Sequence, residues 1–268
     1  MPVVAAAGDI ACEPDREAAG AICAQQIVSD AILADKAIDF VLTLGDSQYN
    51  SGTLAEYRGS YDKTWGRFKR KTRPVPGNHD YNTPGAAGYF DYFGSAAGER
   101  DKGYYSFDIG AWHFVALNSE RDLEESGAQV AWLEADLAAH PNRCVAGFWH
   151  RPRWSSGEEH GDSDSVAAFV QALYDAGADL ILSGHEHNYE RFRPLNPSGA
   201  RDDARGIVQV VAGLGGRSQY DLSGRDTTVA KDDTTYGYLR MVLHADSADM
   251  TYVPAVGAFR DSFRLICH

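Results

Sequence analysis

The chain is organised around the stretch Gly184–Arg191, which reads GHEHNYER. Its two histidines, His185 and His187, are separated by one residue, so both rings can point into one pocket. The apolar run Ala178–Ser183 before it predicts a short buried strand, and open α/β sheets place ligands at the carboxyl ends of their strands. An isolated His-x-His pair is more often a surface turn than a metal site. The pair therefore becomes informative only together with the rest of the chain.

Composition limits the classes of protein that fit. The chain has 268 residues, 44% of them hydrophobic, which is enough for one large core, and we expect a single domain over residues 1–268. Its 25 basic and 38 acidic side chains give a formal charge of −13, which repels nucleic acid and anionic membranes at long range. Bound cations would reverse the field locally. We therefore expect no nucleic acid or membrane partner, while small anionic substrates stay open.

Targeting and redox signals leave two locations open. No apolar run approaches the roughly 20 residues that span a bilayer, and the first residues lack a signal peptide pattern, so we expect a soluble chain. The cysteines lack the Cys-x-x-Cys spacing of a zinc knuckle, and they form either four free thiols or two disulfides with three possible pairings. A mature secreted or periplasmic domain is favoured, and a cytoplasmic protein with buried thiols is the alternative.

Strands alternate with helices through most of the chain. Apolar runs predict strands at Val3–Ala7, Asp39–Leu44, Arg143–Trp149 and Ala178–Ser183, with an extended piece at Arg73–Pro76. Helical spacing predicts helices at Ala24–Ile32, Val130–Leu137 and Val166–Tyr174, and one within Asn50–Lys71. Later strands are predicted at Tyr104–Asp108 and Trp112–Asn118, which form a hairpin, and at Ile207–Ala212, Tyr236–His244 and Asp249–Val256. The remaining long segment, Tyr81–Lys102, is predicted to be a loop over the site. This order of elements predicts an α/β fold with two mixed sheets and helices outside.

Polar side chains recur where these strands end. They are Asp9, Asp46, Tyr49, Asn78, His79, Asp80, His150, His185 and His187. Each alone has an ordinary explanation, such as a helix cap or a hydrogen-bonded core histidine. Together, carboxylate, imidazole, amide and phenol groups suit hard to borderline metals, and they exceed the ligands of one tetrahedral zinc. The set therefore predicts two metal ions.

Five ordered motifs resemble those of the calcineurin-like metallophosphoesterases. They are Gly8-Asp9, Gly45–Tyr49 (GDSQY), Gly77–Asp80 (GNHD), His150 and Gly184–His187 (GHEH). Tyr49 and the segment Asn188–Arg191 (NYER) are similar to the purple acid phosphatase branch in particular. The resemblance implies a four-layer αββα sandwich of two mixed β-sheets flanked by helices, with one site across the strand ends.

The resemblance also implies a ligand set for each metal. One metal is expected to take Asp9, Asp46, Tyr49 and His187, and the other to take Asp46, Asn78, His150 and His185. Many metallophosphoesterases have a histidine two residues after the first aspartate, but here that residue is Ala11, and Tyr49 would replace it. Because a phenol with a pKa near 10 needs a strongly acidic cation, we expect Fe(III) beside Tyr49, with Zn, Fe or Mn in the second position.

Catalytic roles follow from the same resemblance. His79, next to Asp80, is expected to be a charged group over the phosphate whose ring is oriented by a carboxylate. His160 lies on a loop where purple acid phosphatases carry histidines that contact the substrate or leaving group, and a solvated surface histidine is its alternative. Three arginines, Arg151, Arg153 and Arg191, are candidates for phosphate contacts or for ordinary surface positions.

The implied activity is hydrolysis of a small phosphorylated substrate, above all a phosphomonoester, by water that two cations activate for attack on phosphorus. A phosphodiesterase acting on cyclic nucleotides or lipid head groups is the alternative, and a non-catalytic metal- or phosphate-binding module is a third possibility. We expect a monomer. Cys12 lies just after the first motif, and in this feature the chain resembles bacterial secreted relatives that have cysteines near the same position. We expect Cys12 to pair with Cys23, which is close in sequence, and Cys144 with Cys267 by elimination.

Overall fold

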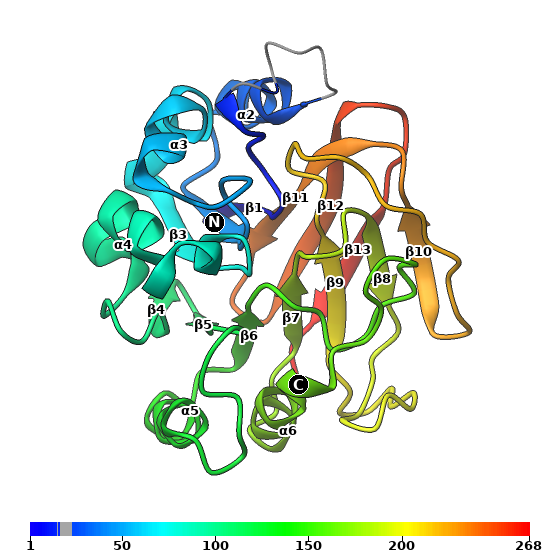
Figure 1. Ribbon diagram of the computed structural model, residues 1–268. Coiled ribbons are helices and arrows are strands. Elements are labelled where there is room, and N and C mark those ends of the chain that lie inside the picture. Colours follow the sequence, from blue (N-terminus) through cyan, green and yellow to red (C-terminus); the bar gives the residue numbers. More distant parts are fainter. Residues whose placement is uncertain (15, 17–22) are drawn as a thin grey trace.

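Two mixed sheets form the centre of the molecule (Figure 1). The structure is a computed structural model that describes residues 1–14, 16 and 23–268. The six-stranded sheet has, in spatial order, the strands β13 (Ser262–Ile266), β12 (Ser247–Val256), β11 (Tyr236–Leu243), β1 (Val3–Ala7), β2 (Phe40–Leu44) and β3 (Thr72–Val75). The seven-stranded sheet has β10 (Thr228–Asp232), β8 (Tyr189–Phe192), β9 (Val208–Ala212), β7 (Leu180–Ser183), β6 (Cys144–Phe148), β5 (Trp112–Ala116) and β4 (Tyr105–Ile109).

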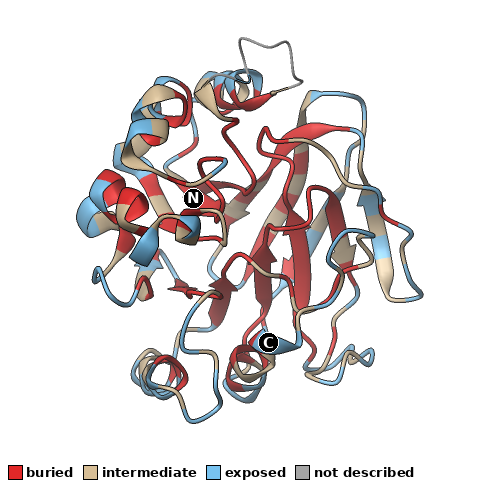
Figure 2. Cartoon of the chain, viewed as in Figure 1, coloured by how far each residue is buried: buried red, intermediate tan, exposed pale blue. Residues whose placement is uncertain are grey.

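Three hydrophobic clusters join these sheets and the helices into four layers. One cluster lies between the sheets and takes alternate residues of each strand, such as Val4 and Ala6 of β1. The opposite face of β1, including Ala5, belongs to a second cluster with the helices α2 (Gln25–Ala34), α3 (Leu54–Gly59) and α4 (Ala87–Phe93). The third cluster joins the other sheet to α5 (Ala128–Ala139) and α6 (Ala167–Asp175). Because both faces of the central strands are covered, these strands are buried throughout (Figure 2), and the predicted fold class is confirmed.

Parallel pairing brings the polar strand ends to one edge of the molecule. In the first sheet, β1, β2 and β3 run parallel. In the second sheet, β5, β6, β7 and β9 do so. The carboxyl ends of these strands therefore meet at a common edge, which is where the polar motifs begin.

The prediction of a loop at Tyr81–Lys102 is wrong. The segment forms α4 together with the short 3₁₀ helices η3 (Asp80–Asn82), η4 (Pro84–Ala86) and η5 (Gly94–Ala97). Further 3₁₀ helices are η1 (Tyr61–Lys63), η2 (Trp65–Lys71) and η6 (Asp164–Val166). The aromatic side chains of α4 are buried against those of α3 and η1, so tertiary packing forms this helix where the sequence has no helical period.

Three strands escaped the sequence analysis. β8 begins within the stretch Gly184–Arg191, for which no strand was predicted, and it hydrogen-bonds to β9 and β10. β10 and β13 are edge strands of the two sheets, with exposed and polar positions that weaken the apolar signal.

Both disulfide predictions are confirmed. Cys12 is bonded to Cys23, and Cys144 is bonded to Cys267. The second bond links β6 of the seven-stranded sheet to the residue that follows β13 of the other sheet. Within the described residues, no helix combines the length and apolar character needed to cross a membrane.

Candidate metal centre

Three of the predicted ligands have an unusual backbone conformation. Asp9, Asp46 and His185 follow β1, β2 and β7 and have left-handed backbone angles, with φ of 59°, 46° and 70°. Such angles are uncommon for residues with a side chain and are concentrated at functional sites. Space is tight around these ligands, since a Cβ on Gly77 would lie 2.2 Å from Asp46 Oδ1. The turns therefore bring backbone and ligands close together at the shared edge.

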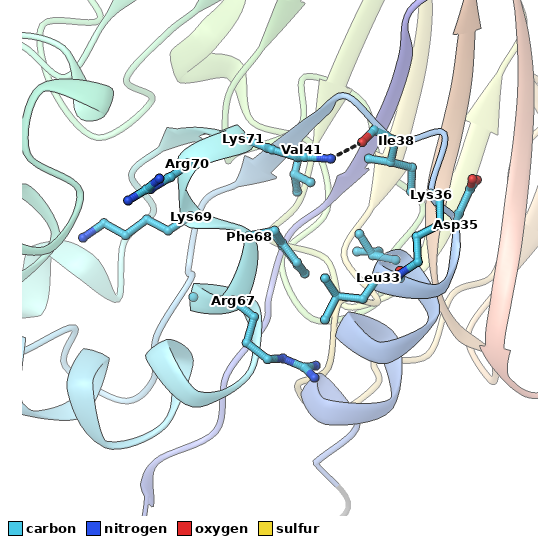
Figure 3. A pocket seen from close by; sticks show the side chains of 12 residues that line it. Leu33, Asp35, Lys36, Ile38, Val41, Arg67, Phe68, Lys69, Arg70 and Lys71 are labelled. Atoms are coloured by element: carbon cyan, nitrogen blue, oxygen red, sulfur yellow. Dashed lines mark hydrogen bonds between the residues drawn. The ribbon is translucent and has the colours of Figure 1, made fainter.

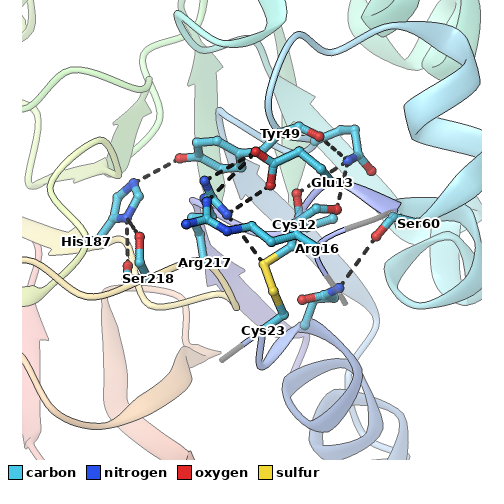
Figure 4. The surroundings of a disulfide bond; sticks show 12 residues. Cys12, Glu13, Arg16, Cys23, Tyr49, Ser60, His187, Arg217 and Ser218 are labelled. Atoms are coloured by element: carbon cyan, nitrogen blue, oxygen red, sulfur yellow. Dashed lines mark hydrogen bonds and ion pairs between the residues drawn. A yellow bond between two sulfur atoms is a disulfide. The ribbon is translucent and has the colours of Figure 1, made fainter. Parts of the chain in front are cut away.

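The first group of donors surrounds the phenol of Tyr49. Its hydroxyl donates to Asp9 Oδ1 at 2.9 Å and lies 2.9 Å from His187 Nε2. The other ring nitrogen of His187, Nδ1, lies 2.6 Å from the carbonyl oxygen of Ser218 and donates to it (Figure 4). With the hydrogen of a neutral ring on Nδ1, the His187 Nε2 carries a lone pair that faces the Tyr49 hydroxyl and Asp9 Oδ1.

The second group surrounds His150. Its Nδ1 donates to the carbonyl oxygen of Leu44 at 2.9 Å. Its Nε2 lies 3.2 Å from Asp46 Oδ2, 3.1 Å from Asn78 Oδ1 and 3.2 Å from His185 Nδ1. Asp46 Oδ2 and Asn78 Oδ1 can only accept, so two acceptor oxygens and a second imidazole nitrogen converge on one nitrogen that can supply at most a single proton.

This donor set fits two cations. In each group, the oxygen and nitrogen lone pairs that face one another outnumber the hydrogens that could form hydrogen bonds between them. A bound cation would interact favourably with all of these lone pairs at once. Asp9, Asp46 and His150 also offer ligand atoms that all lie within 4.8 Å of one another, so the two groups adjoin. The structure thus brings together all seven predicted ligands, and their binding of metal stays a prediction.

Burial and neighbouring charges shift the pKa values of several predicted ligands in opposite directions. Burial favours neutral His150, but the Asp46 carboxylate outweighs it and raises the pKa of the imidazole to about 10. Burial likewise opposes the charge on Asp46, yet His150 holds the pKa of that carboxyl below its ordinary value. Burial and the neighbouring His150 lower the pKa of His185, whose ring is therefore neutral, as metal binding requires. Burial, followed by the carboxylates of Asp46 and Asp9, raises the pKa of Tyr49 well above its ordinary value.

His79 lies at the mouth of the site, but its expected orientation by Asp80 is wrong. Its Nδ1 contacts the carbonyl oxygen of Asn50 at 2.7 Å, and its Nε2 lies 4.0 Å from Asp46 Oδ2. Asp80 is buried behind it and accepts a hydrogen bond from the Tyr57 hydroxyl at 2.5 Å. Burial and the Asp46 carboxylate raise the pKa of Asp80 to about 7. A backbone carbonyl therefore orients the His79 ring.

The ring of His160 lies over a predicted ligand. Its centroid is 4.0 Å from that of His185, and the two planes are tilted by 32°. The side chain is 38% exposed, so it borders the site and contacts solvent. The structure therefore brings His160 to the edge of the predicted ligands, and its contact with a substrate stays a prediction.

Only one of the three candidate arginines is near the ligands. Arg151 Nη1 lies 3.2 Å from His185 Nε2, and its Nε pairs with Glu120 at 2.9 Å. Arg153 and Arg191 form ion pairs with aspartates that are not among the predicted ligands. A role for them as structural ion pairs accounts for these contacts.

Two residues of the site were missed. The guanidinium of Arg217 lies 4.8 Å from the ring centre of Tyr49 (Figure 4), and the ring of Tyr220 stacks on His187 at 3.9 Å. Both follow β9, in the segment 213–220, which reads GLGGRSQY. This segment begins at the carboxyl end of another parallel strand, so the same strand-end reasoning would have found it.

A surface pocket of about 550 Å³ lies elsewhere (Figure 3). It is lined by apolar residues such as Leu33 and Phe68 and by basic residues such as Lys71, next to the amino ends of β2 and β3. None of the predicted site residues lines it. The pocket is therefore separate from the metal centre.

A sequence model of the calcineurin-like phosphoesterases matches residues 3–189. The chain therefore belongs to this family. The matched range contains the five motifs and every predicted ligand, so the resemblance noted in the sequence is confirmed.

Curated relatives of the chain are purple acid phosphatases. Purple acid phosphatase 15 of Arabidopsis thaliana is 30% identical over 218 residues, which cover 68% of this chain and 40% of that protein. Purple acid phosphatase 23 of the same plant is 32% identical over 180 residues, covering 60% of this chain and 38% of the relative. The chain thus spans about two fifths of the length of these relatives.

Solved structures share the fold. Purple acid phosphatase PPD1 from yellow lupin (Lupinus luteus) seeds superposes with a TM-score of 0.78 at 21% identity, over 98% of this chain and 53% of that one. A dimetal phosphatase from Danio rerio gives 0.67 at 14% identity, over 100% and 99% of the two chains.

Proposed function

We propose that the protein hydrolyses small phosphomonoesters at a centre of two metal ions. The observation that carries this proposal is the convergence of seven oxygen and nitrogen donors in two adjoining groups, with too few hydrogens to satisfy them. Family membership and the purple acid phosphatase relatives support the same activity.

Each group of donors would hold one cation. Asp9, Tyr49 and His187 would hold the first, and Asn78, His150 and His185 the second, with Asp46 shared between them. A tyrosine ligand favours Fe(III) in the first position, with Zn, Fe or Mn in the second. When bound, two cations bind phosphate oxygens and lower the pKa of the attacking water.

The protein's own side chains complete the site. His79 lies on the Asp46 side and His160 on the His185 side, so their rings flank the donors. Either imidazolium can offset the charge of the phosphate or protonate the departing alkoxide. Asp80 acts from behind, because its carboxylate accepts the backbone N–H of Gly77 at 2.9 Å and so fixes the motif that carries Asn78.

The test is a comparison of two substrates. The purified protein, loaded with iron and zinc or with manganese, is assayed with p-nitrophenyl phosphate and bis(p-nitrophenyl) phosphate, with Asp46→Asn as the inactive control. We expect kcat/KM to be higher for the monoester. A preference for the diester would replace the proposal with a phosphodiesterase, and no turnover by a chain that carries two metals would indicate a binding module.

We also propose that the protein is a secreted or periplasmic monomer. All four cysteines are paired, which supports an oxidising compartment. Gel filtration and alkylation of the unreduced protein test both statements, since free thiols or a dimer would contradict them.

A further inference from the structure

Glu186 lies between two predicted metal ligands but points away from them. Its carboxylate is fully buried, and Oε1 accepts the backbone N–H groups of His160 at 2.9 Å and Gly161 at 2.6 Å. In the described part of the chain, Oε2 has no hydrogen-bond partner. A buried carboxylate that accepts two amide hydrogens makes strong, charge-assisted bonds. The side chain therefore ties the loop of His160 to the metal-binding motif.

The same loop is held at a second point. Glu190, four residues further along, accepts the backbone N–H of Ser156 at 2.8 Å and the Ser156 hydroxyl at 2.5 Å. The loop also lies directly against Glu186, since a Cβ on Gly157 would be 2.3 Å from its Oε2. Two buried carboxylates thus fix both ends of the segment 156–161.

The contact made by Glu186 determines where His160 stands. The His160 amide is bonded to the residue that follows His185, and the His160 ring stacks on the His185 ring at 4.0 Å. The backbone and the ring of His160 therefore both contact the motif Gly184–His187. A half-exposed histidine on a free loop would lack this constraint, and a shift of about 1 Å in a catalytic group can cost about 10²-fold in rate.

We propose that Glu186 is a positioning residue that holds His160 beside the substrate. This inference rests on the proposed function, because it requires His160 to act on a phosphate ester. In the described chain, no hydrogen bond or ion pair joins the Glu186 side chain to the seven predicted ligands, whereas its Oε1 lies 3.6 Å from His160 Nδ1 as well as accepting the two amide hydrogens. The loss of its carboxylate should release the His160 amide while the metal ligands keep their places.

The test uses Glu186→Ala, Glu186→Gln, His160→Ala and the double variant with alanine at both positions. We expect each alanine variant to keep two metals by plasma emission and to lose kcat by about 10²-fold. The double variant should lose no more than His160→Ala alone, because the two residues act as one unit. Glu186→Gln should stay within about threefold of the wild type, since its amide oxygen still accepts both N–H groups.

A second readout does not depend on turnover. Amide hydrogen exchange across residues 156–162, measured by mass spectrometry, should show protection in the wild type and in Glu186→Gln and its loss in Glu186→Ala. The matched control is Asp179→Ala, which also removes a buried carboxylate that accepts two backbone N–H groups, those of Val145 and His268. This control should lower thermal stability and leave kcat/KM and the 156–162 exchange unchanged.

Distinct outcomes would overturn the proposal. Losses that multiply in the double variant would give Glu186 a role of its own, and loss of metal in Glu186→Ala would make it a support for the ligands. Full activity of His160→Ala would show that Glu186 has no catalytic group to position. The proposed function would still stand in that case, because the wild type turns over its substrate. If the wild type has no turnover, the proposed function fails, and the positioning role fails with it because no reaction remains for His160.

Discussion

Tyr49 is the predicted ligand whose role can be tested by colour, because an Fe(III) tyrosinate absorbs visible light. It is 2% exposed, and its raised pKa keeps the phenol protonated in the metal-free protein. Only a strongly acidic cation can ionise it. We expect the wild type loaded with iron under air to show a broad visible charge-transfer band that Tyr49→Phe abolishes. Tyr220→Phe is the matched control and should keep the band. A colourless wild type that carries iron would disprove the tyrosinate.

His79→Ala should separate chemistry from metal binding. The backbone N–H of His79 donates to Asp46 Oδ1 at 2.8 Å, and alanine retains that bond, so two metals should remain by plasma emission. The ring is lost, and we expect kcat to fall by about 10²-fold. His244→Ala, remote from the donors, serves as the control with normal activity. Loss of metal in His79→Ala would show instead that the ring is a ligand.

The sequence singled out residues that the structure brings together, but it did not reveal several of their contacts. Asp9, Asp46 and His185 follow apolar runs directly, so strand ends located them. The partner of the His79 ring is a backbone carbonyl of residue 50, and no side-chain pattern reports such an acceptor. Glu186 was hidden for a similar reason, because its partners are the amide hydrogens of a loop that is distant in sequence.

At the scale of elements, α4 depends on one close approach. A Cβ on Gly88 would lie 2.1 Å from the carbonyl oxygen of Gly52, so this helix packs directly on the backbone of the preceding loop. Helix propensity alone would make Gly88→Ala stabilising by about 1 kcal/mol. We expect the clash to dominate and the variant to lose about 1–3 kcal/mol in urea denaturation.

Asp91→Ala, an exposed change on the same helix, controls for the Gly88 substitution and should stay within about 0.5 kcal/mol of the wild type. A stabilised Gly88→Ala would show that α4 can move away from the loop.

The contrast between α4 and the central strands explains which elements the sequence analysis could predict. Strands buried on both faces form continuous apolar runs, whereas α4 is set by contacts with residues some 30 positions earlier.

For the whole molecule, the two disulfides differ in the length of chain that they close. Cys144 and Cys267 are separated by 123 positions, and Cys12 and Cys23 by 11. Chain entropy predicts that paired serine substitutions cost about 5 kcal/mol for the long loop and about 3 kcal/mol for the short one. Urea denaturation of the two double variants measures the difference. Equal losses would mean that native packing, and not loop closure, determines the effect.

The left-handed backbone conformations at Asp9, Asp46 and His185 lower the stability of the fold at positions whose side chains the proposed activity needs. They are three of the five non-glycine residues with positive φ in the described chain, and each such turn costs about 1 kcal/mol. Glycine would relieve that cost and remove the donor at the same position. A laboratory evolution experiment that rewarded heat resistance alone would therefore drift towards glycine here and yield sturdier but inactive enzymes, so stabilised versions of this protein should be sought at positions away from this edge.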